Sequence, residues 1–264
     1  FPVIGFGLGI LVFLAFVILL YVPPLKSSWL KAANGLLAAA LGPLLAPAEP
    51  AAGATHALAR PIVEADLERL PEPVRRYLRA SGVVGSPPVS AVHLKFKGQF
   101  KLDTNAAWMA VTAEQVSTFD PPARLFYIHG KPWPFISISG IDSWAGEQGR
   151  MRMRLFSRVP LFDLTGDAFT SSGMVSFMND MVLFPQAFLS TNLSWKAVDG
   201  EHAEATLTVG ARRVSALLCI NAKGELTNFI SEDRWRLEGT EPLPRDPRRP
   251  GPEFLAAFTR LGSE

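Results

Sequence analysis

The sequence predicts an α+β fold class: an N-terminal transmembrane helix followed by a mainly antiparallel β domain, a curved sheet or half-barrel with one packed helix. Residues 1–22 carry no charged side chain. Apolar and polar residues alternate through much of residues 92–237, as in strands with one buried face. Residues 168–184 interrupt that alternation with apolar residues at helical spacing, which predicts the packed helix.

The first segment is long enough to cross a membrane. At about 1.5 Å per residue, a helix over residues 1–22 spans roughly 33 Å, against a hydrocarbon core of about 30 Å. We expect an anchor and not a signal peptide, because the segment lacks a basic start and a small-residue cleavage site. The aromatic residues expected in the membrane or at its interface are Phe6, Phe13, Phe16, Tyr21 and Trp29.

A second apolar segment, residues 29–46, holds Lys31 and Asn34. This pattern favours a helix lying in the interface, with a second span as the alternative. With one span, Lys26 and Lys31 place the following domain on the cytoplasmic side of a bacterial inner (plasma) membrane, and two spans reverse that side. Residues 47–61, rich in Pro, Ala and Gly, form the expected linker to a β domain over residues 62–238.

The β domain opens with a short helix in LPEPVRRYLRASG, where Pro73 suits the first turn and Gly82 the end. A strand follows in which Val92, Leu94 and Phe96 alternate with polar residues. Turns are expected at Asp120-Pro121-Pro122, Asp199-Gly200 and Lys223-Gly224, and further strands at residues 107–119, 124–129, 134–140, 150–155, 193–198, 204–209, 212–220 and 225–237.

One helix covers only part of a sheet of this size, so a groove or cavity is expected beside it. Its candidate lining residues are Met174, Phe177, Met178 and Met181, with ordinary core packing as the alternative. An unfilled apolar cavity above about 300 Å³ that opens toward the membrane would favour a ligand carrier. A cavity filled by Phe and Met side chains would favour a structural subunit.

Charge and the tail suggest partner surfaces. The chain has 26 basic and 24 acidic residues, so no global charge attracts nucleic acid. A basic stripe on two strands would contact anionic headgroups or an acidic partner if the strands are neighbours, and is otherwise a solvated face; its residues are Lys95, Lys97, Lys101, Arg150, Arg152 and Arg154. Residues 239–264 form a Pro-rich extended tail with a short terminal helix, which docks on a partner or on its own domain through Phe254, Leu255, Phe258 and Leu261.

Residues for catalysis, cofactors or metals do not form a recognisable motif. The single cysteine, Cys219, lies in an apolar run, and the histidines are scattered: His56, His93, His129 and His202. Turn and strand-end roles are favoured over an acid–base pair for Glu114, Asp120, Asp163 and Asp167. We therefore expect no catalytic, cofactor-binding or metal-binding residues and no enzyme.

Several stretches resemble one known family. LPEPVRRYLRASGVVGSPPV, WMAVTAEQVSTFDPPARLFY, GRMRMRLFSRVPLFDLTGD, MVLFPQAFL and RWRLEG are similar to the blocks of a widespread bacterial family catalogued only as a domain of unknown function. The resemblance covers about residues 62–238 and implies a shared fold and membrane attachment, but no activity. In outline the predicted sheet around a helix is similar to the half-barrels of lipoprotein-carrier proteins, which hold acyl chains.

The expected function is therefore that of a membrane-anchored, non-catalytic accessory subunit that stabilises a larger integral-membrane complex of the respiratory or photosynthetic kind. Its expected partners are subunits of that complex and lipids, not nucleic acid. The alternative is a carrier or sensor that binds a lipid or another hydrophobic ligand in the cavity of the sheet, and an uncharacterised enzyme comes third.

Overall fold

The computed structural model describes residues 60–101, 107–238, 241–244 and 256–260. All of them belong to one of the two units into which the chain divides, Thr55–Glu264. The predicted anchor, the segment 29–46 and nearly all of the linker lie outside the described residues. Within the described ranges, no helix is both long and apolar enough to cross a membrane.

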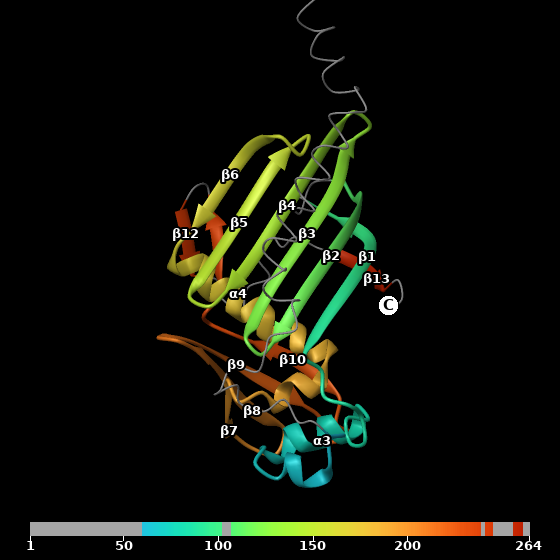
Figure 1. Cartoon of the computed structure of the whole chain (residues 1–264), viewed down its shortest axis with the longest axis vertical. Helices are drawn as coiled ribbons and strands as arrows, with labels where there is room; N and C mark the ends of the chain where they lie inside the picture. Colours follow the sequence, from blue (N-terminus) through green and yellow to red (C-terminus); the bar gives the residue numbers. More distant parts are fainter. Residues whose placement is uncertain (1–59, 102–106, 239–240, 245–255, 261–264) are drawn as a thin grey trace, which may run out of the picture. The chain divides into compact units, whose positions relative to one another are not determined.

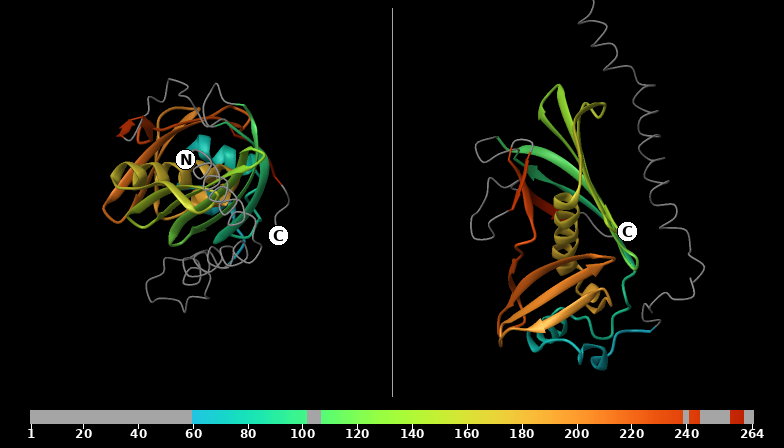
Figure 2. Two further views of the ribbon diagram at one scale, coloured as in Figure 1. Left: turned by 90° about the horizontal axis from the view of Figure 1, so that it is seen from above. Right: turned by 90° about the vertical axis from the view of Figure 1, so that its left-hand side faces the viewer.

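The larger sheet, sheet A, has seven strands in the order β13-β1-β2-β3-β4-β5-β6 (Figure 1). Its strands are β1 (Ala91–Phe100), β2 (Met109–Phe119), β3 (Pro122–Trp133), β4 (Ile136–Ala145), β5 (Gln148–Leu155), β6 (Val159–Thr165) and β13 (Ala256–Arg260). Every neighbouring pair is antiparallel. Figure 2 shows that the sheet twists and bends around a helix on its concave face.

Two smaller sheets complete the strands of the described ranges. Sheet B has the order β10-β9-β8-β7, and sheet C pairs β11 with β12. The strands are β7 (Leu193–Ala197), β8 (His202–Val209), β9 (Arg212–Ile220), β10 (Leu226–Ile230), β11 (Trp235–Glu238) and β12 (Glu241–Pro244). The mainly antiparallel α+β class is confirmed, but the strands form separate sheets where one curved sheet was expected. The helical stretch after β6 breaks the meander, and the chain begins a new sheet at β7.

That stretch contains the helix α4 (Asp167–Asp180), followed by the single turns η2 (Met181–Leu183) and η3 (Pro185–Leu189). The helix lies along the concave side of sheet A (Figure 2). Two glycines allow the close approach: a Cβ on Gly149 would lie 2.4 Å from the backbone oxygen of Phe169, and one on Gly173 would lie 2.8 Å from the Trp144 Cβ. Contact this close leaves no space for a side chain at either position.

The predicted helix at LPEPVRRYLRASG is confirmed as α3 (Glu72–Ala80), preceded by the short η1 (Glu64–Leu67). It packs with α4 and sheet B to form a continuous apolar core, which we call the packed core. This core includes Leu67, Val74, Tyr77, Leu78, Met174, Phe177, Met178, Met181, Phe188, Leu207, Leu218 and Ile220, of which all but Tyr77 are at most 1% exposed.

The tail differs from its prediction. Residues Ala256–Arg260 form the strand β13, where a short helix was expected, and β13 pairs with the outer edge of β1 so that Phe258 lies opposite Gly98. A strand satisfies backbone groups that an open sheet edge would leave unpaired, which a helix at this place could not do. The other predicted docking residues, Phe254, Leu255 and Leu261, lie outside the described residues.

Candidate functional site

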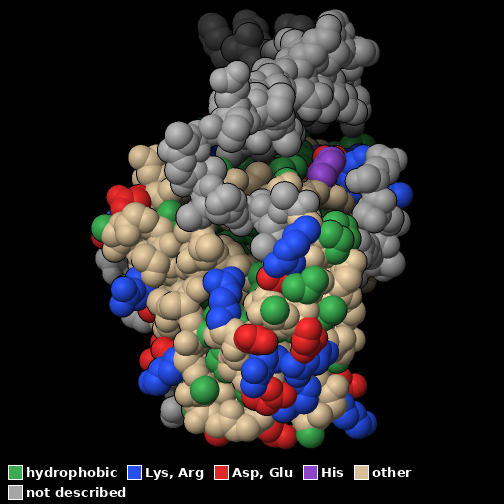
Figure 3. Space-filling view, turned by 60° about the horizontal axis from the view of Figure 1, so that its bottom comes forward, with side chains coloured by type: hydrophobic (Ala, Val, Ile, Leu, Met, Phe, Trp, Pro, Cys, Tyr) green, Lys and Arg blue, Asp and Glu red, His purple; other side chains and the backbone are tan. Residues whose placement is uncertain are grey.

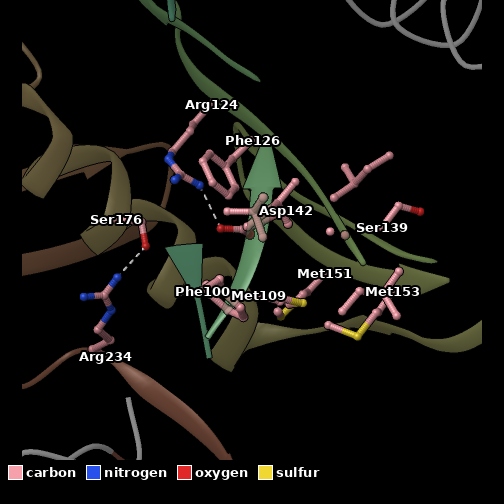
Figure 4. Close-up of a pocket in the computed structure, with 16 residues that line it drawn as sticks. Phe100, Met109, Arg124, Phe126, Ser139, Asp142, Met151, Met153, Ser176 and Arg234 are labelled. Carbon is pink, nitrogen blue, oxygen red and sulfur yellow. Dashed lines mark hydrogen bonds and ion pairs between the residues drawn. The ribbon is translucent and has the colours of Figure 1, made fainter. Parts of the chain in front are cut away.

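A pocket of about 200 Å³ lies on the concave side of sheet A (Figure 4). The register explains its wall: Phe126 lies opposite Asp142, which lies opposite Met151, so these three side chains point to the same face. Residues of β1 to β5, of α4 and of the segment before β11 line it. The apolar lining includes Phe100, Met109, Val111, Phe126, Ile128, Ile138, Met151 and Met153.

A buried arginine stands at one side of the pocket. The Nη1 of Arg124 donates to Oδ2 of Asp142 at 2.7 Å, and its Nε donates to Oδ2 of Asp180 at 2.6 Å. The same Asp180 oxygen accepts a hydrogen bond of 2.9 Å from Gln115 Nε2. The guanidinium carbon also lies 5.1 Å from the centre of the Phe126 ring. Arg124 thus ties β3 to β4 and α4, and Asp180 of α4 adds the link to β2.

The Arg124 side chain is only 9% exposed. Burial by itself lowers the pKa of Arg124, but the nearby Asp180 and Asp142 carboxyl groups outweigh it, and the pKa is raised above its ordinary value. The guanidinium therefore stays charged in a site from which water is largely excluded, and two carboxyl groups compensate it.

A second arginine completes the polar side of the pocket. Arg234, immediately before β11, donates from Nη2 to Ser176 Oγ on α4 at 2.9 Å, and both residues line the pocket (Figure 4). The arrangement thus combines a wide apolar wall with the guanidinium groups of Arg124 and Arg234 and with the carboxylate of Asp142, which lines the pocket and compensates Arg124. Such a pocket suits an amphiphile with an apolar body and an anionic or polar end.

The predicted cavity-lining residues do not line this pocket. Met174, Phe177, Met178 and Met181 are each at most 1% exposed and belong to the packed core. The methionines of the pocket are Met109, Met151 and Met153. A sequence signal for two of these existed, because Met151 and Met153 alternate with arginines in β5. The volume is below the value of about 300 Å³ at which small-molecule pockets typically begin.

The predicted basic stripe is divided between distant strands. The strands β2, β3 and β4 lie between β1, which carries Lys95 and Lys97, and β5, which carries Arg150, Arg152 and Arg154. Arg150 forms an ion pair of 2.6 Å with Asp163. Burial and the adjacent Arg150 lower the pKa of Arg152. The six residues therefore do not form one continuous stripe.

The histidines and acidic residues considered for chemistry are placed apart. His93 Nε2 lies 3.4 Å from Glu114 Oε2, and His202 Nδ1 lies 2.8 Å from Asp199. Asp163 pairs with Arg150, and Asp167 with Arg212. Among the residues that the structure describes, no three His, Cys, Asp or Glu side chains come together in a way that could hold a metal ion. Burial raises the pKa of the Cys219 thiol, which is half-buried.

The molecule is thus an α+β protein in which an open antiparallel sheet holds a helix and a small apolar pocket on its concave face. Its chain belongs to the family of unknown function DUF6544, which it matches over residues 60–245. The expected membership of an uncharacterised family is confirmed, and the match includes every residue that lines the pocket. No curated protein and no solved structure matches the chain.

Proposed function

We propose that this domain binds a lipid-like amphiphile in the pocket of sheet A, and that the apolar segment 1–22 attaches it to a bacterial inner membrane. The observation that carries the proposal is the composition of the pocket: its lining joins apolar side chains from five strands to Arg234 and to Arg124, whose charge Asp142 and Asp180 compensate. An apolar chain would lie against Ile128, Met151 and Met153, and an acidic or polar end would accept hydrogen bonds from Arg234.

The size of the pocket limits the ligand. Its volume of about 200 Å³ is larger than an engineered cavity of about 150 Å³ that binds benzene. It is smaller than pockets for drug-sized molecules, which begin at about 300 Å³. We therefore propose that the pocket takes one acyl or isoprenoid segment and not an entire phospholipid.

A photoactivatable fatty acid tests this proposal with the full chain in lipid nanodiscs. After illumination, peptide mass spectrometry should find the crosslinks on β3, β4 and β5. Ile128→Phe fills the pocket, because Ile128 lines it, and should lower the crosslinking about tenfold, which corresponds to about 1.4 kcal/mol of binding.

The matched control is Leu125→Phe, which makes a similar change on the opposite face of the same strand and outside the pocket. It should crosslink like the wild type. Equal crosslinking of all three proteins, or crosslinks confined to residues outside sheet A, would overturn the proposal.

A second candidate is the non-catalytic accessory subunit of a larger integral-membrane complex, and the edge of sheet A favours it. Among the described strands none pairs with the outer edge of β6, which exposes Val159 and Leu161. An exposed apolar edge suits a partner chain. Leu161→Lys should remove co-purifying membrane proteins from the native membrane without changing fatty-acid crosslinking. Unchanged co-purification would contradict this role of the edge.

A further inference from the structure

Two hairpins of sheet A lie at the same end of the sheet as the last residue of β1 and the first of β2. One row of paired residues crosses the sheet there. Phe100 of β1 lies opposite Met109 of β2, and the row continues on β2 to β6 with Val111, Gly130, Ile138, Leu155 and Val159, each opposite the next. The end of β1, the start of β2, the β3–β4 hairpin and the β5–β6 hairpin all lie at or beyond that row. We call this the hairpin end of sheet A and define it by Lys101, Trp108, Lys131, Trp133, Phe135 and Arg158.

The hairpin end exposes large aromatic side chains. Phe135 is 77% exposed, Trp133 63% and Trp108 46%. These are three of the four exposed Trp and Phe side chains of the described residues. Exposing so much apolar area to water is unfavourable. Several exposed aromatic side chains at one end of a sheet therefore indicate a surface that binds a membrane or another molecule.

In the two hairpins at this end, every charged side chain is basic. The β3–β4 hairpin reads KPWPFISI and the β5–β6 hairpin LFSRVPLF, each with one basic and no acidic residue. In the β1–β2 connection, the Lys101 ammonium lies 5.1 Å from the centre of the Trp108 ring. At the α3 end, in contrast, acidic residues lie among the basic ones, as Asp66 beside Arg60 and Glu64 beside Arg79. Figure 3 shows acidic and basic side chains side by side over that part of the surface.

Two features favour a lipid surface over a protein strand as the occupant. Pro132 and Pro134 flank Trp133, and neither has a backbone N–H to pair with an added strand. Tryptophan is also typical of the headgroup level of a bilayer, where lysine and arginine meet phosphate groups. The combination of Trp133 and Phe135 with Lys131 and Arg158 matches the chemistry of an anionic membrane interface.

We propose that the hairpin end docks on an anionic lipid bilayer, with Trp133 and Phe135 at the boundary of headgroups and acyl chains. Lys131 and Arg158 then contact lipid phosphates. This goes beyond the proposed function, since docking does not depend on whether the pocket is filled. Phe100, Met109, Gly130 and Ile138 of the pocket lie on the row that bounds the hairpin end, which would bring a bound ligand close to the bilayer.

Spin labelling of the full chain in nanodiscs tests the docking. A label is placed at Phe135→Cys, in a Cys219→Ala background that leaves a single thiol. The control label is placed at Val198→Cys, an exposed position in the β7–β8 turn of sheet B. Power saturation with oxygen and with a water-soluble nickel complex then measures how deeply each label is immersed.

In discs with about 30 mol% phosphatidylglycerol, we expect the label at position 135 to be shielded from nickel and the label at position 198 to be accessible. Lys131→Gln should lower the ratio of docked to undocked protein about fivefold, because it removes one basic residue worth about 1 kcal/mol near the surface. Equal nickel access at both positions, in anionic and in zwitterionic discs, would overturn the proposal.

Discussion

The packed core and the wall of the pocket are both apolar, but they are covered to different degrees. In the packed core, Leu207 and Leu218 are 0% exposed, because α3 and α4 both pack with sheet B. On the concave face of sheet A, Ile128, Met151 and Met153 stay half-buried, and α4 is the only described helix beside them. One helix is too narrow to cover a sheet of seven strands. We therefore propose that a ligand covers the part of the apolar wall that α4 leaves uncovered.

Charge separates the two regions as well. Arg124, with Asp142 and Asp180, stands where the open wall meets α4, and its compensated charge holds the helix against three strands. Toward the α3 end the ion pairs lie at the surface, as with Arg60 and Asp66. The comparison predicts that stability is concentrated in the packed core and the Arg124 cluster, and that the pocket wall contributes binding more than stability.

One of the largest effects is expected at Arg124. Arg124→Met should lower the free energy of unfolding by about 3 kcal/mol, because it leaves the half-buried carboxyl groups of Asp142 and Asp180 without their partner. Urea unfolding followed by circular dichroism measures it. The control Arg150→Met removes an exposed ion pair and should change stability by less than about 1 kcal/mol. Similar small losses in both variants would contradict the structural role of Arg124.

A pair of truncations compares the two regions directly. Leu218→Ala should destabilise by about 2 to 5 kcal/mol, because it opens a cavity in the packed core. Met153→Ala should lower the free energy of unfolding by about 1 kcal/mol or less. It enlarges a pocket that is already open, so fewer packing contacts are lost. The same urea series measures both, and a Met153→Ala loss as large as that of Leu218→Ala would show that the wall is packed like the core.

A smaller effect tests the packed core at high pH. Tyr77 donates from its hydroxyl to the Val182 carbonyl at 2.8 Å, and burial raises the pKa of Tyr77 above its ordinary value of 10.0. The neutral form is therefore favoured in the folded state, so its contribution to stability is complete below about pH 10 and is lost as the pH rises from there through the raised pKa of the folded state.

Tyr77→Phe should lower the unfolding free energy by about 0.5 to 1.5 kcal/mol at pH 7, because the hydrogen bond is lost. The difference from the wild type should shrink as the pH rises above about 10. Urea titrations at a series of pH values measure the difference. A difference that stays constant across this range would mean that the Tyr77 pKa is not shifted.

The smallest effect is expected at the hairpin end. Phe156 and Ser157 form the β5–β6 turn with φ of 51° and 59°, the left-handed region that favours glycine. Ser157→Gly should raise the unfolding free energy by about 0.5 to 1 kcal/mol. Glycine removes the backbone strain of the folded turn, and this gain exceeds the entropic cost of a more flexible unfolded chain. Gly146→Ala is the opposite control, since Gly146 has φ of 56°, and should destabilise. A loss of stability with Ser157→Gly would contradict the turn geometry.

Local periodicity predicted most of the described strands and the two described α-helices, α3 and α4. The alternation of Val92, Leu94 and Phe96 corresponds to β1, and the apolar spacing in residues 168–184 to α4 and η2. These predictions succeed because side-chain alternation reports which face of one element is buried. The helix ends earlier than the pattern, at Asp180, whose carboxylate is used in the Arg124 cluster.

Alternation does not report which strands are neighbours. The sequence therefore predicted Met174 and Phe177 as the lining of a cavity, whereas Met151 and Met153 line the pocket and the first two lie in the packed core. The buried arrangement of Arg124 with Asp142 and Asp180 joins residues up to 56 positions apart, and no local pattern announces it. The tail strand β13 was missed because its partner β1 is distant in the sequence.

Mass spectrometry of the protein purified from its own membrane in mild detergent tests the proposed ligand most directly. We expect one lipid-like molecule bound per protein, retained by Leu125→Phe and lost from Ile128→Phe. A wild-type protein that carries no such molecule, or one whose bound lipid is unchanged by Ile128→Phe, would contradict it.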